Sequence, residues 1–319
     1  MTQEFRWVLA RAFGPLPGPG EGLHAGSSGA ALARTLDLAP RIATRQERER
    51  LVLEVGAEGA RALASARGVA AVAADDLLGA ALDVRDAARD LGAPVPIVLL
   101  KGVALTATGV AVPGSRWLGD VDILCPAWAL ESLAAALRER GYARVEGVPT
   151  CDHQLAPLRG RSGRVVELHR FLPGVRLRGA PGFATAEELA ERDLLRSPTG
   201  ALHGCWVPSR DVLGAHALVH GIAQHGLSPR SYPLMRMLAD LVDLGWGAPG
   251  HGEAAAAAAD LTARHVSRDE REAVLDLCRR LRAGEALPDR LTRRAGPAHR
   301  LLGHVLAGSL DPSYSDSLK

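Results

Sequence analysis

The sequence predicts an α+β protein, in which a small mixed β-sheet core is flanked by an N-terminal helical segment and a C-terminal helical domain. Strand candidates fall between residues 97 and 169, whereas stretches with helical spacing lie on both sides. The length of 319 residues also exceeds one typical domain. We therefore expect three parts: residues 1–92 as the helical segment, 93–183 as the core and 184–319 as the helical domain.

Composition fits a folded protein without a dominant charge. Hydrophobic residues make up 47% of the chain and aromatic residues only 4%, so the core must consist mainly of Leu, Val and Ala. The 38 Lys and Arg residues nearly balance 36 Asp and Glu residues. A net charge of +2 does not indicate a nucleic-acid-binding protein, although a local basic face is compatible with it.

Cysteine spacing and the absence of long apolar runs bear on the compartment. The four cysteines are widely separated and form no Cys-x-x-Cys pair, which argues against a zinc ribbon or a secreted disulfide scaffold. No apolar run approaches the ~20 residues that span a bilayer. Residues 1–6 lack the basic-then-apolar layout of a signal peptide. We expect a cytoplasmic protein with no membrane partner.

The N-terminal part reads as helices joined by loops. Residues 1–13 have apolar spacing for one helix, and residues 14–30 form a Gly- and Pro-rich linker. From residue 31 to residue 91 we expect about three helices, with breaks near Pro40, Gly68 and Gly92. These helices are interpreted as scaffold.

The core begins where a strand runs directly into a helix. The apolar segment Ile97–Leu100 is followed by Lys101 and Gly102, which begin a helical stretch. Free backbone N–H groups at such a corner favour an anion. Lys101 would add its charge on a phosphate; the simpler interpretation is a lysine at a strand end with its ammonium group in water.

Two aspartates follow on the next strand candidate. Alternate side chains of a strand share a face, so Asp120 and Asp122 would point to one side. Their repulsion becomes tolerable if a divalent cation such as Mg²⁺ lies between them; otherwise the pair is a solvated strand end. Arg116 lies four residues earlier, where it would either orient the carboxylates or clamp phosphate oxygens.

A third strand candidate, residues 164–169, places Glu167 and His169 on one face. Glu167 is the candidate third carboxylate, because a glutamate on an apolar strand needs charged partners nearby; the alternative is an edge strand with a wet face. His169 would orient Glu167, contact a phosphate or simply end the strand. A further strand is expected over residues 153–158, and a hairpin-like turn over residues 159–163.

Residues from about 185 onward read as helical packing. Capping boxes begin at Thr185 and Ser267, and residues 253–265 form an alanine-rich helix. His216 and His220 are spaced i, i+4 on one helix face. We favour histidines that are hydrogen-bonded at a lobe interface over metal ligands; lining of an acceptor pocket is a further possibility.

Three motifs in order resemble a known family. Leu100–Gly102, Arg116–Asp122 and Glu167–His169 match the Leu-Lys-Gly, Arg-x-x-x-Asp-x-Asp and Glu-Leu-His motifs of an uncharacterised bacterial nucleotidyltransferase family in the polymerase-β-like superfamily. The resemblance covers roughly residues 31–246 and is strongest over 99–169. In the wider superfamily a Gly-Ser pair usually holds the triphosphate, and here Lys101 and Gly102 take its place.

The resemblance implies the chemistry of the site. An acceptor hydroxyl would take a nucleoside monophosphate from a nucleoside triphosphate such as ATP, with release of pyrophosphate. Asp120, Asp122 and Glu167 would be the catalytic carboxylates and would hold two Mg²⁺ ions, or Mn²⁺ in their place. The nucleotide phosphates would be bound by four residues: Lys101, Gly102, Arg116 and His169. A small molecule, a peptide or protein, and a tRNA end are all open as acceptors.

Other functions with an Asp-x-Asp motif were weighed. A haloacid-dehalogenase-type phosphohydrolase needs an apolar run before the first aspartate, where this chain has Arg116 and Gly119. A glycosyltransferase would use the motif to hold a sugar nucleotide. An inactive nucleotidyltransferase-like binding module is the third alternative, although the intact set of charged residues argues against it.

Overall fold

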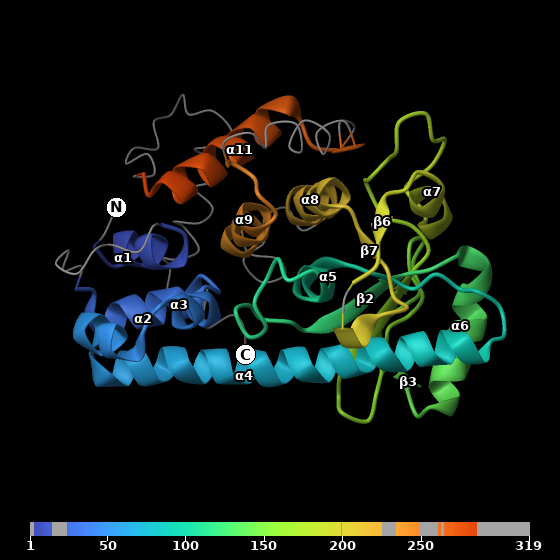
Figure 1. Ribbon diagram of the computed structural model, residues 1–319, viewed down its shortest axis with the longest axis horizontal. Helices are drawn as coiled ribbons and strands as arrows, with labels where there is room; N and C mark the ends of the chain where they lie inside the picture. The colour runs from blue at the N-terminus through green and yellow to red at the C-terminus, as the bar shows by residue number, and fades with distance from the viewer. Residues whose placement is uncertain are drawn as a thin grey trace.

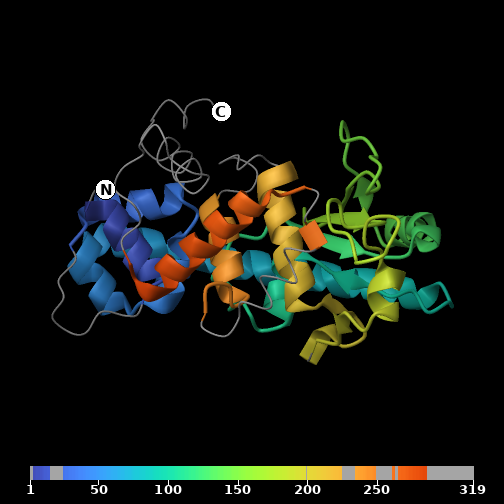
Figure 2. The same ribbon diagram turned by 90° about the horizontal axis from the view of Figure 1, so that it is seen from above.

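The computed structural model describes residues 3–14, 24–198, 200–224, 234–248, 261–262 and 265–285. Its longest element is helix α4, Arg48–Asp90, which runs along one whole side of the molecule (Figure 1). The N-terminal helices pack on the first part of α4, and the sheet lies beside its second part (Figure 2). This arrangement confirms the predicted α+β class with a small mixed sheet.

Three short helices form the N-terminal end: α1, Gln3–Ala12; α2, Gly26–Thr35; and α3, Ala39–Arg45. Helix α2 begins inside the stretch that was predicted as a linker, so the linker is shorter than residues 14–30; residues 15–23 lie outside the described ranges. The predicted break near Pro40 is present as the start of α3, where proline is tolerated because its missing N–H is not needed.

The predicted break at Gly68 is wrong, because α4 continues through it. A stripe of small and branched side chains, including Leu63, Ala66, Ala70 and Leu77, stays buried on one face, and this packing outweighs the low helix propensity of glycine. The non-helical residue lies earlier, at Gly56, with φ 75° and ψ 168°. Helix α4 ends two residues before Gly92, close to the predicted position.

A buried ion pair joins α1 to α4. Glu54 accepts hydrogen bonds from Trp7 at 2.9 Å and from the Nε of Arg11 at 2.7 Å, and the Arg11 side chain is fully buried.

We expect Glu54→Ala to lower the free energy of unfolding by about 3–5 kcal/mol, because the Arg11 charge would remain buried without its partner. Thermal unfolding followed by circular dichroism measures this. Glu58→Ala, on an exposed position of the same helix, should stay within about 0.5 kcal/mol of the wild type; equal losses in both variants would contradict the prediction.

The central sheet has five strands in the order β1-β2-β5-β4-β3. The bounds are β1, Val98–Leu99; β2, Asp120–Leu124; β3, Ala143–Arg144; β4, Leu158–Arg159; and β5, Val165–His169. Strands β2 and β5 are parallel, with Asp122 opposite Glu167, whereas the other neighbours are antiparallel. Helix α5, Lys101–Ala107, follows β1, and α6, Leu130–Glu139, preceded by the 3₁₀ turn η1, Ala127–Ala129, packs against α4.

The strand predicted over residues 153–158 is mostly irregular. Only β4 at its end is a strand, and Pro157 cannot donate a ladder hydrogen bond just before it. Isolated backbone contacts still tie the segment to β5: the N–H of Leu155 donates to Leu168, and that of Arg170 donates to His153. The turn predicted over residues 159–163 is present between β4 and β5.

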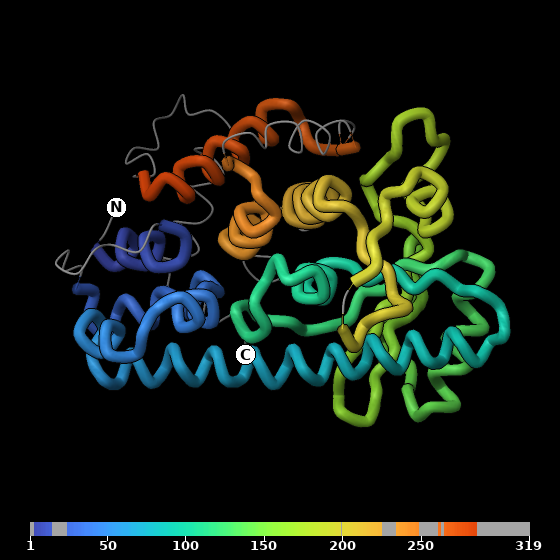
Figure 3. The backbone as a smooth tube through the Cα atoms, in the orientation of Figure 1, coloured from blue at the N-terminus to red at the C-terminus, as the bar shows by residue number. Residues whose placement is uncertain are grey.

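The sequence had predicted purely helical packing after residue 184, and this prediction is wrong because the segment also contains two strands. Helix α7, Ala186–Glu191, is followed by a two-stranded sheet of β6, Leu195–Arg196, and β7, Val207–Pro208, with the 3₁₀ turn η2, Gly200–Leu202, between them. Trp206 exchanges backbone hydrogen bonds with the edge of β1, and this edge pairing accounts for the added strands. The path of the chain from β7 into α8 is visible in Figure 3.

Four further helical elements complete the described chain: α8, Arg210–Leu218; η3, a π-helical turn over Val219–Gln224; α9, Leu234–Asp243; and α11, Arg268–Ala283. The capping boxes at Thr185 and Ser267 are both formed. Most of the helix predicted over residues 253–265 lies outside the described ranges. One hydrophobic core includes residues of all three predicted parts, so the division into domains stays a prediction. Within the described residues, no helix is long and apolar enough to cross a membrane.

Candidate active site

Two adjacent parallel strands bring the predicted carboxylates to one place. Because Asp122 of β2 is directly opposite Glu167 of β5, their side chains share a face of the sheet, and Asp120 lies two residues away on that same face. This face forms the floor of a cavity of about 540 Å³. The described residues that line the cavity are Lys101, Asp120, His153, Gln154, Glu167, His169, Pro173, His216, His220 and Gln224.

Asp122 lies beneath this floor and is only 2% exposed. Its Oδ1 atom accepts from Lys101 Nζ at 2.6 Å and lies 2.9 Å from His169 Nε2. Burial alone would raise the pKa of Asp122, but the Lys101 charge and the His169 hydrogen bond outweigh burial and hold that pKa well below its usual range. Asp122 is therefore an ionised carboxylate, and Lys101 and His169 fix its orientation.

The pKa values of Asp120 and Glu167 are raised, whereas that of Asp122 is lowered. The charge of Asp122, followed by burial, raises the pKa of Asp120 to about 6. Burial, followed by the charge of Asp122, raises the pKa of Glu167 to about 7. Three carboxylates around one lysine leave an excess of negative charge that a bound cation would relieve.

The donor set suits a divalent cation. Asp122, Glu167 and His169 each offer one ligand atom, and these three atoms lie within 4.8 Å of one another. This group contains His169 where the sequence had suggested Asp120, which lines the same cavity from the start of β2. Carboxylate oxygens dominate the combined set, and they are the ligands that Mg²⁺ and Mn²⁺ favour.

Lys101 starts α5 in an unusual backbone conformation. Its φ is +47°, a region that non-glycine residues rarely adopt and that occurs preferentially at functional sites. Its ammonium group points to Asp122, and although burial lowers the pKa of Lys101, the charges of Asp122 and Asp120 raise it by more. Lys101 is therefore a cation at the edge of the cavity; its predicted contact with a phosphate stays a prediction.

Arg116 is held by a residue that the sequence had not linked to it. Its Nη2 donates to Asp240 of α9 at 2.9 Å, and both side chains are largely buried. The sequence left open whether Arg116 orients the site carboxylates or clamps phosphate. The Arg116 charge lowers the pKa of Asp120, and the Nη2 atom of Arg116 donates its hydrogen bond to α9. The sequence does carry one signal for this pair. Asp240 lies among apolar residues in the segment 234–243, and a carboxylate buried in such a helix needs a cationic partner.

Gly102 lets Arg116 pass close to the start of α5. A Cβ atom at this glycine would lie 1.9 Å from Arg116 Nη1 and 2.2 Å from Leu118 Cδ2, well inside van der Waals contact. The close approach of the Arg116 side chain, and not a positive φ, is therefore what requires glycine here.

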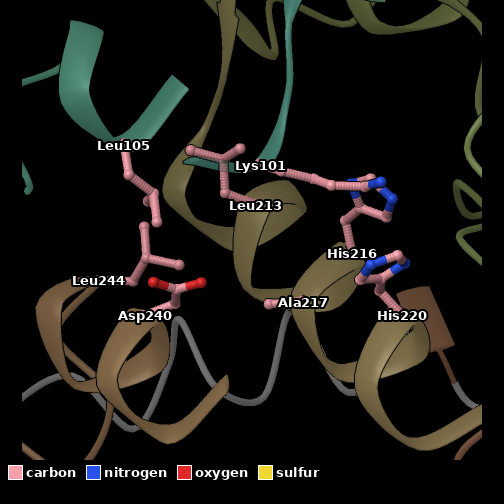
Figure 4. Close-up of a pocket in the computed structure, with 8 residues that line it drawn as sticks. All are labelled: Lys101, Leu105, Leu213, His216, Ala217, His220, Asp240 and Leu244. Atoms are coloured by element: carbon pink, nitrogen blue, oxygen red, sulfur yellow. The ribbon is translucent and has the colours of Figure 1, made fainter. Parts of the chain in front are cut away.

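His216 of α8 and His220 of η3 both line the cavity, and they also line a smaller neighbouring pocket, which is the one drawn in Figure 4. His216 is 3% exposed, and its ring lies 5.9 Å from that of His220. Figure 4 shows both rings on the side of Lys101, with Asp240 and Leu244 on the far side of α8. On the opposite wall, His153 stacks on His169 with 5.7 Å between ring centroids. The sequence had left an acceptor pocket open as one of the possible places of His216 and His220, and it had not assigned His153 to the site.

Comparison with known proteins identifies the class. Residues 28–248 match the family described as uncharacterised nucleotidyltransferase, so the chain belongs to this family, and nucleotidyl transfer is its class of activity. Among solved structures, the solution structure of the antibiotic-resistance factor ANT(2'')-Ia matches with 14% identity and a TM-score of 0.41. The match covers 57% of this chain and 89% of that one. No curated protein sequence matches the chain.

Proposed function

We propose that the protein transfers a nucleoside monophosphate from a nucleoside triphosphate to a hydroxyl group of an acceptor and releases pyrophosphate. The observation that carries this proposal is the convergence of Asp120, Asp122 and Glu167 from two parallel strands on one cavity edged by Lys101. Such an arrangement of carboxylates and a cationic side chain is what phosphoryl-group transfer needs for positioning and charge stabilisation.

Divalent cations would be held by the carboxylates, with His169 orienting Asp122 and available as a nitrogen ligand. When bound, Mg²⁺ or Mn²⁺ would neutralise charge on the triphosphate and activate the attacking oxygen. Lys101 and Arg116 would bind phosphate oxygens, since both stay protonated at neutral pH. Because Gly102 carries no side chain, it leaves the Arg116 guanidinium close to the start of α5.

The chain supplies a proton acceptor of suitable strength. Without a bound cation, burial and the charge of Asp122 raise the pKa of Glu167 to about 7; a cation would lower it, and the Glu167 carboxylate would then be ionised and able to accept a proton. As the acceptor oxygen bonds to the α-phosphorus, its proton would pass to the Glu167 carboxylate. The bond between the α-phosphorus and the bridging oxygen breaks, and pyrophosphate leaves toward Lys101.

Incubation of the protein with each labelled triphosphate and Mg²⁺ or Mn²⁺ tests the proposal. Mass spectrometry of the protein and of a cell extract should show a gain of one nucleoside monophosphate on some species. Glu167→Gln should reduce the rate by about 10²–10³-fold, as removal of a general base typically does. Absence of both the mass gain and pyrophosphate with all four triphosphates would contradict the proposal.

A further inference from the structure

His216 is a buried polar side chain that the reaction scheme does not use. It is 3% exposed, and its side chain lines the cavity. Burial, followed by the nearby Lys101 charge, holds the pKa of His216 well below 6.5, so the ring is neutral. A neutral imidazole offers one donor and one acceptor, so the ring can exchange two hydrogen bonds with a ligand in the cavity.

The wall around His216 consists of hydrogen-bonding side chains. His220 and Gln224 follow it on the π-helical turn, with 2.7 Å between His220 Nδ1 and Gln224 Oε1. Such turns occur preferentially at functional sites. His153 and Gln154 line the opposite side of the cavity. Among the described lining residues, formal charge is confined to Lys101, Asp120 and Glu167 on the floor.

These observations separate the possible acceptors by charge. An amine-rich acceptor would find no acidic partner on the histidine wall, because Asp120 and Glu167 are assigned to the cations. A phosphorylated acceptor would bring its negative charge toward the same two carboxylates. Hydroxyl groups, in contrast, both donate and accept, as do neutral imidazoles and carboxamides.

We infer that the wall formed by His216, His220 and Gln224 binds the acceptor, and that the acceptor is an uncharged polyhydroxyl compound of the sugar or cyclitol type. This inference rests on the proposed function and adds the substrate class. His216 hydrogen-bonds a hydroxyl next to the one that reacts, so it is a binding and positioning residue of the acceptor side.

Acceptors that share one carbon skeleton test the charge requirement. Pyrophosphate release and product mass are measured with glucose, glucosamine and glucose 6-phosphate, with myo-inositol as a second neutral compound. We expect at least a tenfold higher kcat/KM for the neutral compounds than for the charged ones. Preference for glucosamine or glucose 6-phosphate, or no reaction of either neutral compound, would overturn the inference. Triphosphate binding and slow hydrolysis without acceptor report separately on the proposed function.

Two variants test the wall itself. His216→Phe keeps a ring but removes the hydrogen bonds, and it should raise the acceptor KM by about 10–100-fold while the Kd of the triphosphate stays unchanged; His216→Gln should recover part of the loss. Gln224→Glu adds one carboxylate at nearly constant shape and should shift the glucosamine-to-glucose ratio of kcat/KM upward by about tenfold. If His216→Phe weakens triphosphate binding as much as acceptor binding, the wall binds the nucleotide and the inference is wrong.

Discussion

Replacing Asp120 with asparagine is expected to abolish nucleotidyl transfer and, above about pH 6, to make the folded protein more stable. Loss of a carboxylate from the proposed cation site should lower the rate by at least about 10³-fold, since charge stabilisation is the main source of catalysis in such sites. The gain in stability follows from the repulsion between Asp120 and Asp122, which raises the pKa of Asp120.

The direction of the pH effect is set by the raised pKa. In the folded protein Asp120 has a pKa of about 6, above the ordinary value of 3.8 that it regains on unfolding. Its contribution to stability is fully present below pH 3.8 and is lost as the pH rises through 6. At pH 8 the ionised carboxylate therefore costs about 1–3 kcal/mol, which asparagine would restore.

Thermal unfolding of the wild type and of Asp120→Asn at pH 5 and pH 8, without divalent cations, measures this difference. The midpoints should lie closer at pH 5 and diverge at pH 8, with the variant more stable. Asp122→Asn is the matched comparison: it should also lose transfer, but it should destabilise the protein, because Lys101 loses its partner at 2.6 Å. Near-wild-type transfer by Asp122→Asn, or a variant at Asp120 that is less stable at pH 8, would show that the site is misassigned.

Gly102→Ala is expected to raise the KM for the triphosphate by about 10–100-fold, the effect of displacing one charge-assisted phosphate contact. The new methyl group would lie 1.9 Å from Arg116 Nη1 and 2.2 Å from Leu118, so the guanidinium must move away from the start of α5. Its hydrogen bond to Asp240 at 2.9 Å opposes this movement or breaks with it. The measurement is steady-state kinetics with the triphosphate varied, together with thermal unfolding.

Gly79→Ala provides the control for adding a methyl group to a helix. No atom lies within 4 Å of the Cβ position there, so the change should leave KM unaltered and add up to about 1 kcal/mol of stability. Asp240→Asn should reproduce part of the KM increase of Gly102→Ala, because it releases Arg116 from the other side. A Gly102→Ala enzyme with an unchanged KM would mean that Arg116 does not act on the nucleotide.

The alternation of residues along the strands predicted which carboxylates share a face of the central sheet. The alternation of polar and apolar residues placed Asp120 and Asp122 on one face, and the apolar strand around Glu167 placed the third carboxylate, because strand periodicity depends only on neighbouring residues. Parallel pairing of the two strands, which sets Asp122 beside Glu167, is a long-range contact that spacing along the chain does not encode.

The less successful predictions involved tertiary context. Gly68 looked like a helix break, but packing of α4 against the rest of the protein overrides local propensity. Trp206 pairs with the edge of β1, although the sequence around it predicts helix. An open strand edge can pair with an extended segment of chain that lies beside it. Arg116 and Asp240, which are joined by a hydrogen bond, are 124 residues apart, and no local pattern in the sequence links them.

A second ion pair on α9 lies next to the hydrogen bond between Arg116 and Asp240. On α9, one turn before Asp240, Arg236 forms an ion pair with Asp37 in the turn between α2 and α3. Two ion pairs, Asp37 with Arg236 and Asp240 with Arg116, thus link the turn between α2 and α3 through α9 to the segment that precedes β2. The N-terminal helices and the sheet are consequently held together by ion pairs as well as by one shared hydrophobic core, so the sheet does not pack as a separate unit.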